Sequence, residues 1–186
     1  MWSTPDDAIN LVGSLKGTPG CHAKWEVDGS GRLNKIFWST ADQQLLAHQY
    51  GHLVIQDNTC LTNKYDFKLM LFIGVGSENK SVVLAQGFFS DEQTIFTSSA
   101  FVLRTLRRVA HERPETVIIT DADAAMKSAV AAHLPNTVHL HCLWHIINVK
   151  KKCQGALGHK TSHLQSLLYA CAYATSENTF DGVWAK

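Results

Sequence analysis

The sequence predicts an α/β fold built on one mixed sheet, and three observations carry this prediction. Short apolar runs rich in strand-forming residues follow one another in the middle of the chain. Amphipathic segments with helical spacing alternate with further apolar runs in the second half. The resulting order is strand, strand, strand, helix, strand, helix, strand, helix, which favours a mixed sheet with helices on both faces.

Length and composition bound the kinds of protein that this chain can be. Its 186 residues suit one domain with a short additional element. Hydrophobic residues make up 45% and charged residues 18%, so the chain can bury a core. The 17 basic and 16 acidic residues leave a net charge of +1, which excludes a domain held on nucleic acid by bulk charge alone. Any DNA binding must therefore use a local patch or metal ions.

The sequence predicts a soluble chain without a membrane segment. The longest apolar stretch, Leu69–Gly76, is too short to cross a membrane as a helix, and the acidic start does not resemble a secretory signal. The five cysteines are odd in number and scattered. We therefore expect reduced thiols in the cytosol or nucleus rather than a disulfide framework.

Residues 1–50 read as a small preface to the main domain. They contain two short amphipathic segments, the second with Thr40 as the expected N-cap, and two strand-forming runs that flank the turn at Asp28–Gly31. The spacing predicts helices over 6–16 and 40–50 and a hairpin formed by residues 24–27 and 32–38.

Residues 51–160 hold the predicted sheet domain, and its elements follow in a clear order. The first three strands are joined by short turns, so we expect them to pair as antiparallel neighbours. This order is that of the ribonuclease H-like fold. The predicted strands are 53–55, 69–75, 81–89, 116–120 and 137–142, and the predicted helices are 93–112, 124–133, 145–152 and, beyond the domain, 162–174.

Two aspartates stand where strands end. Asp57 follows the first core strand and Asp121 follows the fourth, and these strands are neighbours in a sheet of this order. Paired carboxylates bind hard divalent cations, and two such ions can stabilise the attacking and leaving oxygens of a phosphoryl displacement. The alternative is that each aspartate caps a strand end or turn. Asp91 and Asp123 are weaker rivals, because aspartate is common in loops.

A third carboxylate normally completes such a site. The local candidates are Glu92, Glu177 and Asp181. Glu92 opens the long predicted helix, where the helix dipole also favours an acid. The other two lie in a segment that looks like the capped start of a new helix. For all three residues we prefer the interpretation that they stabilise the start of a helix and do not belong to the site.

A second cluster combines histidine with cysteine. Cys142 and His145 are spaced as C-x-x-H, which can place two ligands on one zinc ion. No second pair of that kind follows, so zinc is not the favoured interpretation. Further ligands could come from His139, His141, Cys153 and His159, but their spacing implies no geometry. The alternative is that Cys142 and Trp144 pack in the core while His145 starts a helix beside the carboxylates.

Basic residues gather in two places, on and after the long predicted helix and after the His145 helix start. Either group could follow a phosphate backbone, although a solvated helix face is the commoner explanation. The residues are Arg104, Arg107, Arg108, His111 and Arg113 in the first group and 150–152 in the second.

Several ordered motifs together resemble one known family, the Mutator-like (MULE) transposases. The upstream Ile36–Trp38 segment is similar to one in the far-red-response group of transposase-derived proteins. The similarity runs from about residue 31 to 152 and more thinly to 184. The matching motifs are 57–65, Gly74-Val75, Asp91-Glu92, 119–126, and Leu134-Pro135 followed by His139 and the Cys142–His145 element.

The resemblance implies a ribonuclease H-like DDE transposase core. Such enzymes cut DNA at element ends and join the free 3′-hydroxyl to target DNA with Mg²⁺ or Mn²⁺. By motif, Asp57 corresponds to the first catalytic acid and Asp121 to the second, while Cys142 and His145 match a supporting signature. The resemblance also implies that the chain acts on DNA at transposon ends and targets and that it can form homo-oligomers. We expect it in the nucleus and not on a membrane.

Departures from the family pattern lower the expected activity. The family's third acid, a glutamate, lies well downstream of the His145 element, and no residue here matches its motif. Residues 161–186 look like the start of a helical insertion, so the expectation is a C-terminally truncated core without the family's N-terminal zinc domain. Residues Ser98–Phe101 stand where a tryptophan is often found in the family. We expect the chain alone to be inactive.

Two other functions stay open. One is a transposase-derived DNA-binding or transcriptional regulator without catalysis. The other is a zinc-stabilised interaction module centred on Cys142 and His145, which a chelator would unfold.

Overall fold

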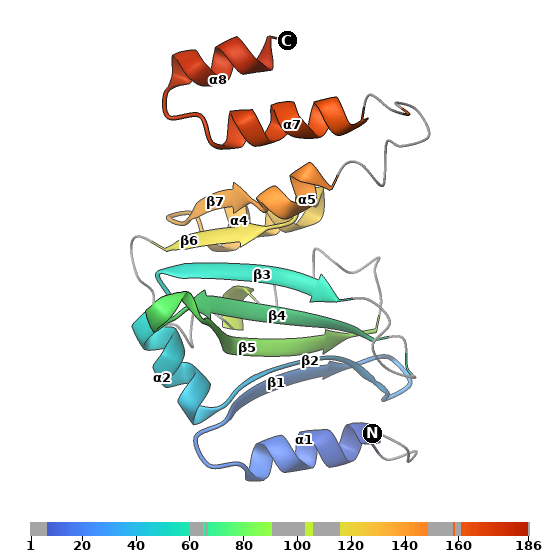
Figure 1. Ribbon diagram of the computed structural model, residues 1–186. Coiled ribbons are helices and arrows are strands. Elements are labelled where there is room, and N and C mark those ends of the chain that lie inside the picture. Colours follow the sequence, from blue (N-terminus) through green and yellow to red (C-terminus); the bar gives the residue numbers. More distant parts are fainter. Residues whose placement is uncertain are drawn as a thin grey trace. The chain divides into compact units, whose positions relative to one another are not determined.

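The computed structural model describes residues 7–59, 65, 67–90, 103–105, 116–148, 158 and 161–185. It divides into two compact units, Met1–Leu140 and His141–Lys186, each of which is treated by itself. The first unit contains nearly the whole sheet with its helices, and the second is helical (Figure 1).

One mixed sheet organises the first unit. Its seven strands lie in the order β1-β2-β5-β4-β3-β6-β7, so β3 occupies a central position (Figure 1). The predicted α/β class and mixed sheet are confirmed. The strands are β1 (His22–Val27), β2 (Leu33–Ser39), β3 (Leu53–Thr59), β4 (Lys68–Val75), β5 (Ser81–Phe89), β6 (Val117–Thr120) and β7 (Val138–His141).

The pairing around β3 follows the prediction from the sequence. Strands β3, β4 and β5 form an antiparallel meander, with Asp57 opposite Leu71. On its other side β3 pairs with β6 in parallel, and Ile55 lies opposite Ile119. The carboxyl ends of β3 and β6 therefore point to the same edge of the sheet.

The hairpin of the N-terminal preface belongs to the same sheet. β1 pairs antiparallel with β2, and β2 pairs antiparallel with β5, with Phe37 opposite Gly87. Gly87 allows this close approach, because a Cβ atom there would lie 2.8 Å from the carbonyl oxygen of Ile36. Residues 22–39 thus extend the sheet of the main domain.

Helices α1 (Asp7–Gly17), α2 (Ala41–Tyr50) and α4 (Ala124–His133) accompany the sheet in this unit. The predicted N-cap of α2 is confirmed as a full capping box. Thr40 Oγ1 accepts the Gln43 backbone N–H at 3.3 Å, and the Gln43 side chain accepts the Thr40 N–H at 3.0 Å. A three-residue 3₁₀ turn, η1 (Ser77–Asn79), connects β4 to β5.

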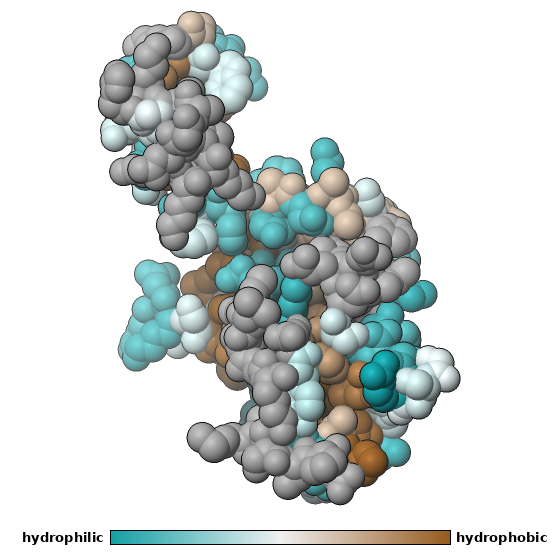
Figure 2. Space-filling view, turned by 90° about the vertical axis from the view of Figure 1, so that its right-hand side faces the viewer, coloured by the Kyte–Doolittle hydropathy of each residue, from teal (hydrophilic) through white to brown (hydrophobic). Residues whose placement is uncertain are grey.

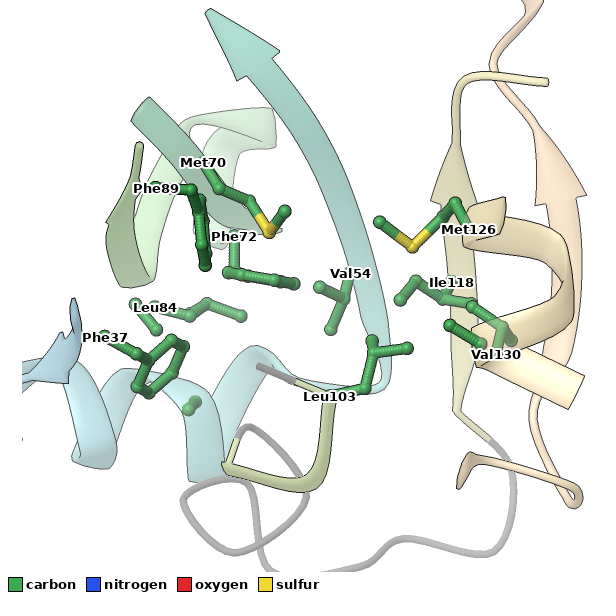
Figure 3. Packing of buried hydrophobic residues seen from close by; sticks show 13 residues of the cluster. Phe37, Val54, Met70, Phe72, Leu84, Phe89, Leu103, Ile118, Met126 and Val130 are labelled. Carbon is green, nitrogen blue, oxygen red and sulfur yellow. The ribbon is translucent and has the colours of Figure 1, made fainter. Parts of the chain in front are cut away.

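The hydrophobic core lies on one face of the sheet, beneath α2 and α4. Val54 of β3 and Ile118 of β6 stand side by side, and Met126 of α4 packs over them (Figure 3). Phe72 of β4 continues the same layer and meets Phe37 of β2 edge to face, at a ring-centroid distance of 6.1 Å. This packing fixes β3 and β6 next to each other, which is what positions the two aspartates.

The second unit consists of α5 (Leu143–Ile147), α7 (Thr161–Ala172) and α8 (Glu177–Trp184). Helix α5 begins two residues before the predicted start, with Cys142 as its N-cap, and it ends at Ile147 rather than continuing to Lys152. Helices α7 and α8 pack against each other. Ser176 caps α8 by accepting the Thr179 N–H at 3.2 Å, as expected for a newly started helix.

Several sequence-based expectations fall on residues outside the described ranges. Of the helix predicted over 93–112, only Leu103–Thr105 is described, and it is helical. Asp91, Glu92 and 150–152 also lie outside. Among the described residues, no helix is long and apolar enough to cross a membrane. The described cysteines Cys21, Cys142 and Cys171 are free thiols.

Candidate active site

Asp57 and Asp121 lie toward the same end of two neighbouring strands, because β3 and β6 are parallel. Ile55 lies opposite Ile119, so two residues further along each chain Asp57 and Asp121 occupy matching positions. β3 still pairs with β4 at Asp57, whereas β6 ends at Thr120, just before Asp121. The prediction that the two strands are neighbours, with both acids at one edge, agrees with this register.

Asp57 lies on the sheet face opposite the main core. Side chains alternate along a strand, and the buried residues Val54 and Gln56 of β3 mark the core face. Asp57 is half-buried on the other face, and Asp121, which follows the end of β6, is half-buried too. Figure 2 shows hydrophilic and hydrophobic residues next to each other on the side of the molecule that faces right in Figure 1.

The hydrogen bonds around the two carboxylates test whether they fit a cation. Asp57 Oδ1 accepts the Asn58 backbone N–H at 2.9 Å. Asp121 Oδ1 is buried, and no hydrogen-bond donor in the described part of the chain reaches it. A buried carboxylate oxygen without a donor is costly unless a cation or water satisfies it, so this oxygen fits a hard divalent ion.

A buried threonine and a histidine from the next strand support the Asp121 position. Thr120 has no exposed surface, and its Oγ1 donates to the carbonyl oxygen of Asp121 at 2.7 Å. The same Oγ1 lies 2.8 Å from Nε2 of His139, in β7. Sequence reasoning missed this contact, and the only signal that pointed to it was a hydroxyl residue directly before the acid.

Asp123 has a structural role. Its side chain accepts the Met126 backbone N–H at 2.8 Å and caps α4. This bond explains an aspartate two residues after Asp121 without any ligand, and it leaves Asp121 as the acid of this turn that fits a cation.

No third ligand joins the pair within the described ranges, which contain no group of three or more His, Cys, Asp or Glu residues arranged to hold a metal ion. Glu177 and Asp181 are exposed residues of α8 in the second unit, in keeping with the structural interpretation. Glu92 lies outside the described residues.

The C-x-x-H residues belong to the second unit. Cys142 is the half-buried N-cap of α5, and His145 lies one turn into that helix. The ring of Trp144 meets the His145 ring edge to face at 4.9 Å between centroids. The expectation that Trp144 packs in the core is wrong, because 65% of its surface is exposed. A helix of five residues buries mainly Ile147 and leaves Trp144 on its outer side.

Arg104 is the described member of the first basic group, and it is exposed on its helical turn between buried Leu103 and Thr105. The remaining residues of both basic groups lie outside the described ranges. A basic surface for phosphates therefore stays a prediction.

The fold and these two acids define a class: a mixed α/β domain with one carboxylate in the second half of a strand and another directly after the neighbouring parallel strand. Comparison with known families then identifies it. Residues 53–149 match the MULE transposase domain. That segment covers β3 to α5 and includes Asp57, Asp121, Cys142 and His145, and the chain belongs to this family. The resemblance predicted from the motifs is confirmed.

Curated relatives of the chain come from Arabidopsis thaliana, and their names refer to FAR1 or to an impaired far-red response. The chain is 29% identical to Protein FAR1-RELATED SEQUENCE 4 over 83% of this chain and 21% of the relative. It is 31% identical to Protein FAR-RED IMPAIRED RESPONSE 1 over 62% of this chain and 14% of that protein. The chain thus spans about a fifth or less of the length of these relatives.

Proposed function

We propose that this chain is the ribonuclease H-like core of a DDE-type transposase and supplies two of the acids for metal-dependent DNA cleavage and strand transfer. The observation that carries the proposal is the position of Asp57 in β3 and of Asp121 directly after β6, each two residues beyond the last paired position of these parallel strands. The sheet order β5-β4-β3-β6-β7, with β4 antiparallel and β6 parallel to β3, supports the ribonuclease H-like assignment.

In this proposal Asp57 and Asp121 would hold Mg²⁺ or Mn²⁺. When bound, such an ion stabilises charge on the oxygens of a phosphodiester under attack by water or a DNA 3′-hydroxyl. The protein would contribute two negatively charged carboxylates, and the pairing of β3 with β6 would bring the residues that carry them to the same edge of the sheet. Since no third ligand stands beside them in the described ranges, we expect weak metal binding and little activity from this chain alone.

A metal titration tests the proposal directly. Mn²⁺ binding to the full chain is measured by electron paramagnetic resonance of the free ion. We expect Asp57→Asn and Asp121→Asn each to lose the site, because each substitution removes a charged ligand and keeps the side-chain size. Asp123→Asn is the matched control: it lies two residues from Asp121, and asparagine also caps helices well. Equal binding by the wild type and Asp121→Asn would reject the proposal.

Cleavage is the second measurement. We expect Mn²⁺-dependent nicking of supercoiled plasmid to be slow in the wild type and absent in Asp57→Asn. Nicking that persists in both aspartate variants would assign the cleavage to a contaminating nuclease and would count against this chain as its source.

The second candidate is a transposase-derived DNA-binding or transcriptional regulator without catalysis. Two observations favour it: the relatives are named for a far-red response, and the two acids have no third partner in the described part of the chain. It predicts DNA binding that is unchanged in Asp57→Asn and that weakens steeply with salt. Fluorescence anisotropy with labelled duplex DNA at two salt concentrations separates the candidates, because the transposase core needs the metal ligands. Both candidate functions require the protein to act on DNA in the nucleus. Light scattering would detect a homo-oligomer.

The zinc-stabilised module is the weakest of the three proposals. It requires Cys142 and His145 to share a zinc ion with two further ligands. Metal analysis of the purified chain and a thermal melt with and without a chelator decide it. A zinc-free protein that melts at the same temperature in both conditions would remove this proposal.

A further inference from the structure

We propose that His139 and Thr120 form a positioning pair that holds Asp121 in place for cation binding; the inference rests on the proposed function of Asp121. Strand pairing alone does not fix this residue. The β3–β6 ladder ends at Ile55 and Ile119, so Asp121 lies beyond the last paired position of β6. The Asp121 backbone must therefore be held by contacts other than the β3–β6 pairing.

The Thr120 hydroxyl provides such a contact. It is fully buried and donates to the Asp121 carbonyl oxygen at 2.7 Å. A hydroxyl has one proton to donate and lone pairs to accept with. Because its proton is used on Asp121, its 2.8 Å contact with His139 must be one in which the histidine donates. Nε2 of His139 therefore carries a proton.

The direction of these two hydrogen bonds shows how the pair would hold the Asp121 turn. The order is His139 Nε2–H to Thr120 Oγ1, and Thr120 O–H to the Asp121 carbonyl. Strand β7 thereby anchors the turn that follows β6, and the carboxylate on that turn keeps a buried Oδ1 with no donor from the described residues. Partners that orient a ligand in this way typically change metal affinity by about tenfold or more when removed.

Two pairs of variants separate a positioning role from general loss of packing. Thr120→Val keeps the shape and removes the hydroxyl, whereas Thr120→Ser keeps the hydroxyl. His139→Leu removes the donor, whereas His139→Gln places an amide N–H near the position of Nε2. We expect Thr120→Val and His139→Leu to weaken Mn²⁺ binding about tenfold, and Thr120→Ser and His139→Gln to bind within about threefold of the wild type.

The outcomes distinguish this inference from the proposed function. If the wild type binds Mn²⁺ through Asp121 but Thr120→Val, still folded by circular dichroism, binds equally well, the positioning pair is wrong and the metal site stands. Equal losses in Thr120→Ser and Thr120→Val would also overturn it, because bulk rather than the hydroxyl would then matter.

A measurement without metal tests the Thr120–His139 pair even if no Mn²⁺ binds. In ¹⁵N NMR at pH 8, Nε2 of His139 is expected to carry the proton. The ¹³C shift of the Asp121 carbonyl is expected to move in Thr120→Val and to stay in Thr120→Ser. An unprotonated Nε2, or a carbonyl shift that is the same in all three proteins, would overturn the inference without touching the assignment of the acids.

Discussion

Aromatic pairs occur in both units of the molecule, and their surroundings differ. In the sheet unit Phe37 and Phe72 meet edge to face at 6.1 Å, and both are fully buried. In the helical unit Phe180 and Trp184 stack at 5.9 Å with an interplanar angle of 11°, and 67% of Trp184 is exposed. The ring-centroid distances are similar although one pair is edge to face and the other is stacked. The larger difference is burial, which we expect to set how much each unit depends on its aromatic residues.

The difference has a consequence for function. The buried layer beneath β3 and β6 is what keeps the two aspartates in register, so the candidate site depends on the core of the sheet unit. The helical unit displays its rings on the surface, where Tyr169 and Tyr173 form a second exposed stack. Substitutions in the two units should therefore differ in their effect on stability and on metal binding.

The largest expected effect is that of Phe72→Ala. Removing a fully buried ring from the centre of the sheet should lower the free energy of unfolding by about 3–5 kcal/mol. Urea denaturation followed by circular dichroism measures this change. The comparison is made with Trp184→Ala, which should cost at most about 1 kcal/mol because the ring is already mostly in water. Similar costs for both would refute the burial argument.

A glycine in each unit gives the next contrast. Gly87→Ala brings a Cβ to within 2.8 Å of the Ile36 carbonyl oxygen and should destabilise the β2–β5 seam by about 1–3 kcal/mol. Gly182 lies inside α8 with no atom within 4 Å of its would-be Cβ, so Gly182→Ala should stabilise that helix by about 0.5–1 kcal/mol. The sign of the change in melting temperature checks both, and the same sign in both variants would contradict the packing account.

Most of the sheet and the two acids could be predicted from the sequence, for a physical reason. The apolar run of β6 ends at Thr120, so the residue pattern locates Asp121 directly after this strand. The prediction that the first core strand ends before Asp57 was wrong, because the polar residues Asp57–Thr59 continue β3 by pairing with β4. The Thr120 contact with His139 could not be predicted, because it depends on β7 lying beside β6 and on the direction of one hydroxyl. The burial of Trp144 was wrongly predicted because hydrophobicity favours burial, while a short helix has few neighbours to bury it against.

Helix caps provide a smaller contrast. Thr40→Ala removes one bond of the α2 capping box and should cost about 1 kcal/mol of unfolding free energy. Ser176→Ala removes the corresponding bond of α8, an exposed helix, and should mainly increase fraying. Amide hydrogen exchange separates the two outcomes: the first variant is expected to lower protection across α2 and the strands it packs on, β4 and β5, and the second only in α8. If Thr40→Ala lowered protection in α2 alone, the effect of the Thr40 cap would be confined to its own helix, like that of the Ser176 cap.

The smallest expected effect lies at the surface of the sheet unit, in the hairpin turn at Asp28. Its Oδ1 accepts the Ser30 hydroxyl at 2.6 Å and the Ser30 and Arg32 N–H groups, and its Oδ2 accepts from the Arg32 guanidinium at 3.1 Å. These bonds, the Ser30 hydroxyl first among them, hold the pKa of the Asp28 carboxyl well below its usual range.

A depressed folded-state pKa gives stability that is complete above the unfolded pKa of about 3.9 and is lost as the pH falls through the folded value. We therefore expect the turn to be unchanged from pH 7 to pH 5 and to loosen only in stronger acid, with Asp28→Asn removing that dependence. The ¹³C shift of the Asp28 carboxyl measures it. Titration at the ordinary aspartate value would show that these surface hydrogen bonds do not persist in solution, and the turn at Asp28 would then contribute nothing to the stability of the sheet unit at neutral pH.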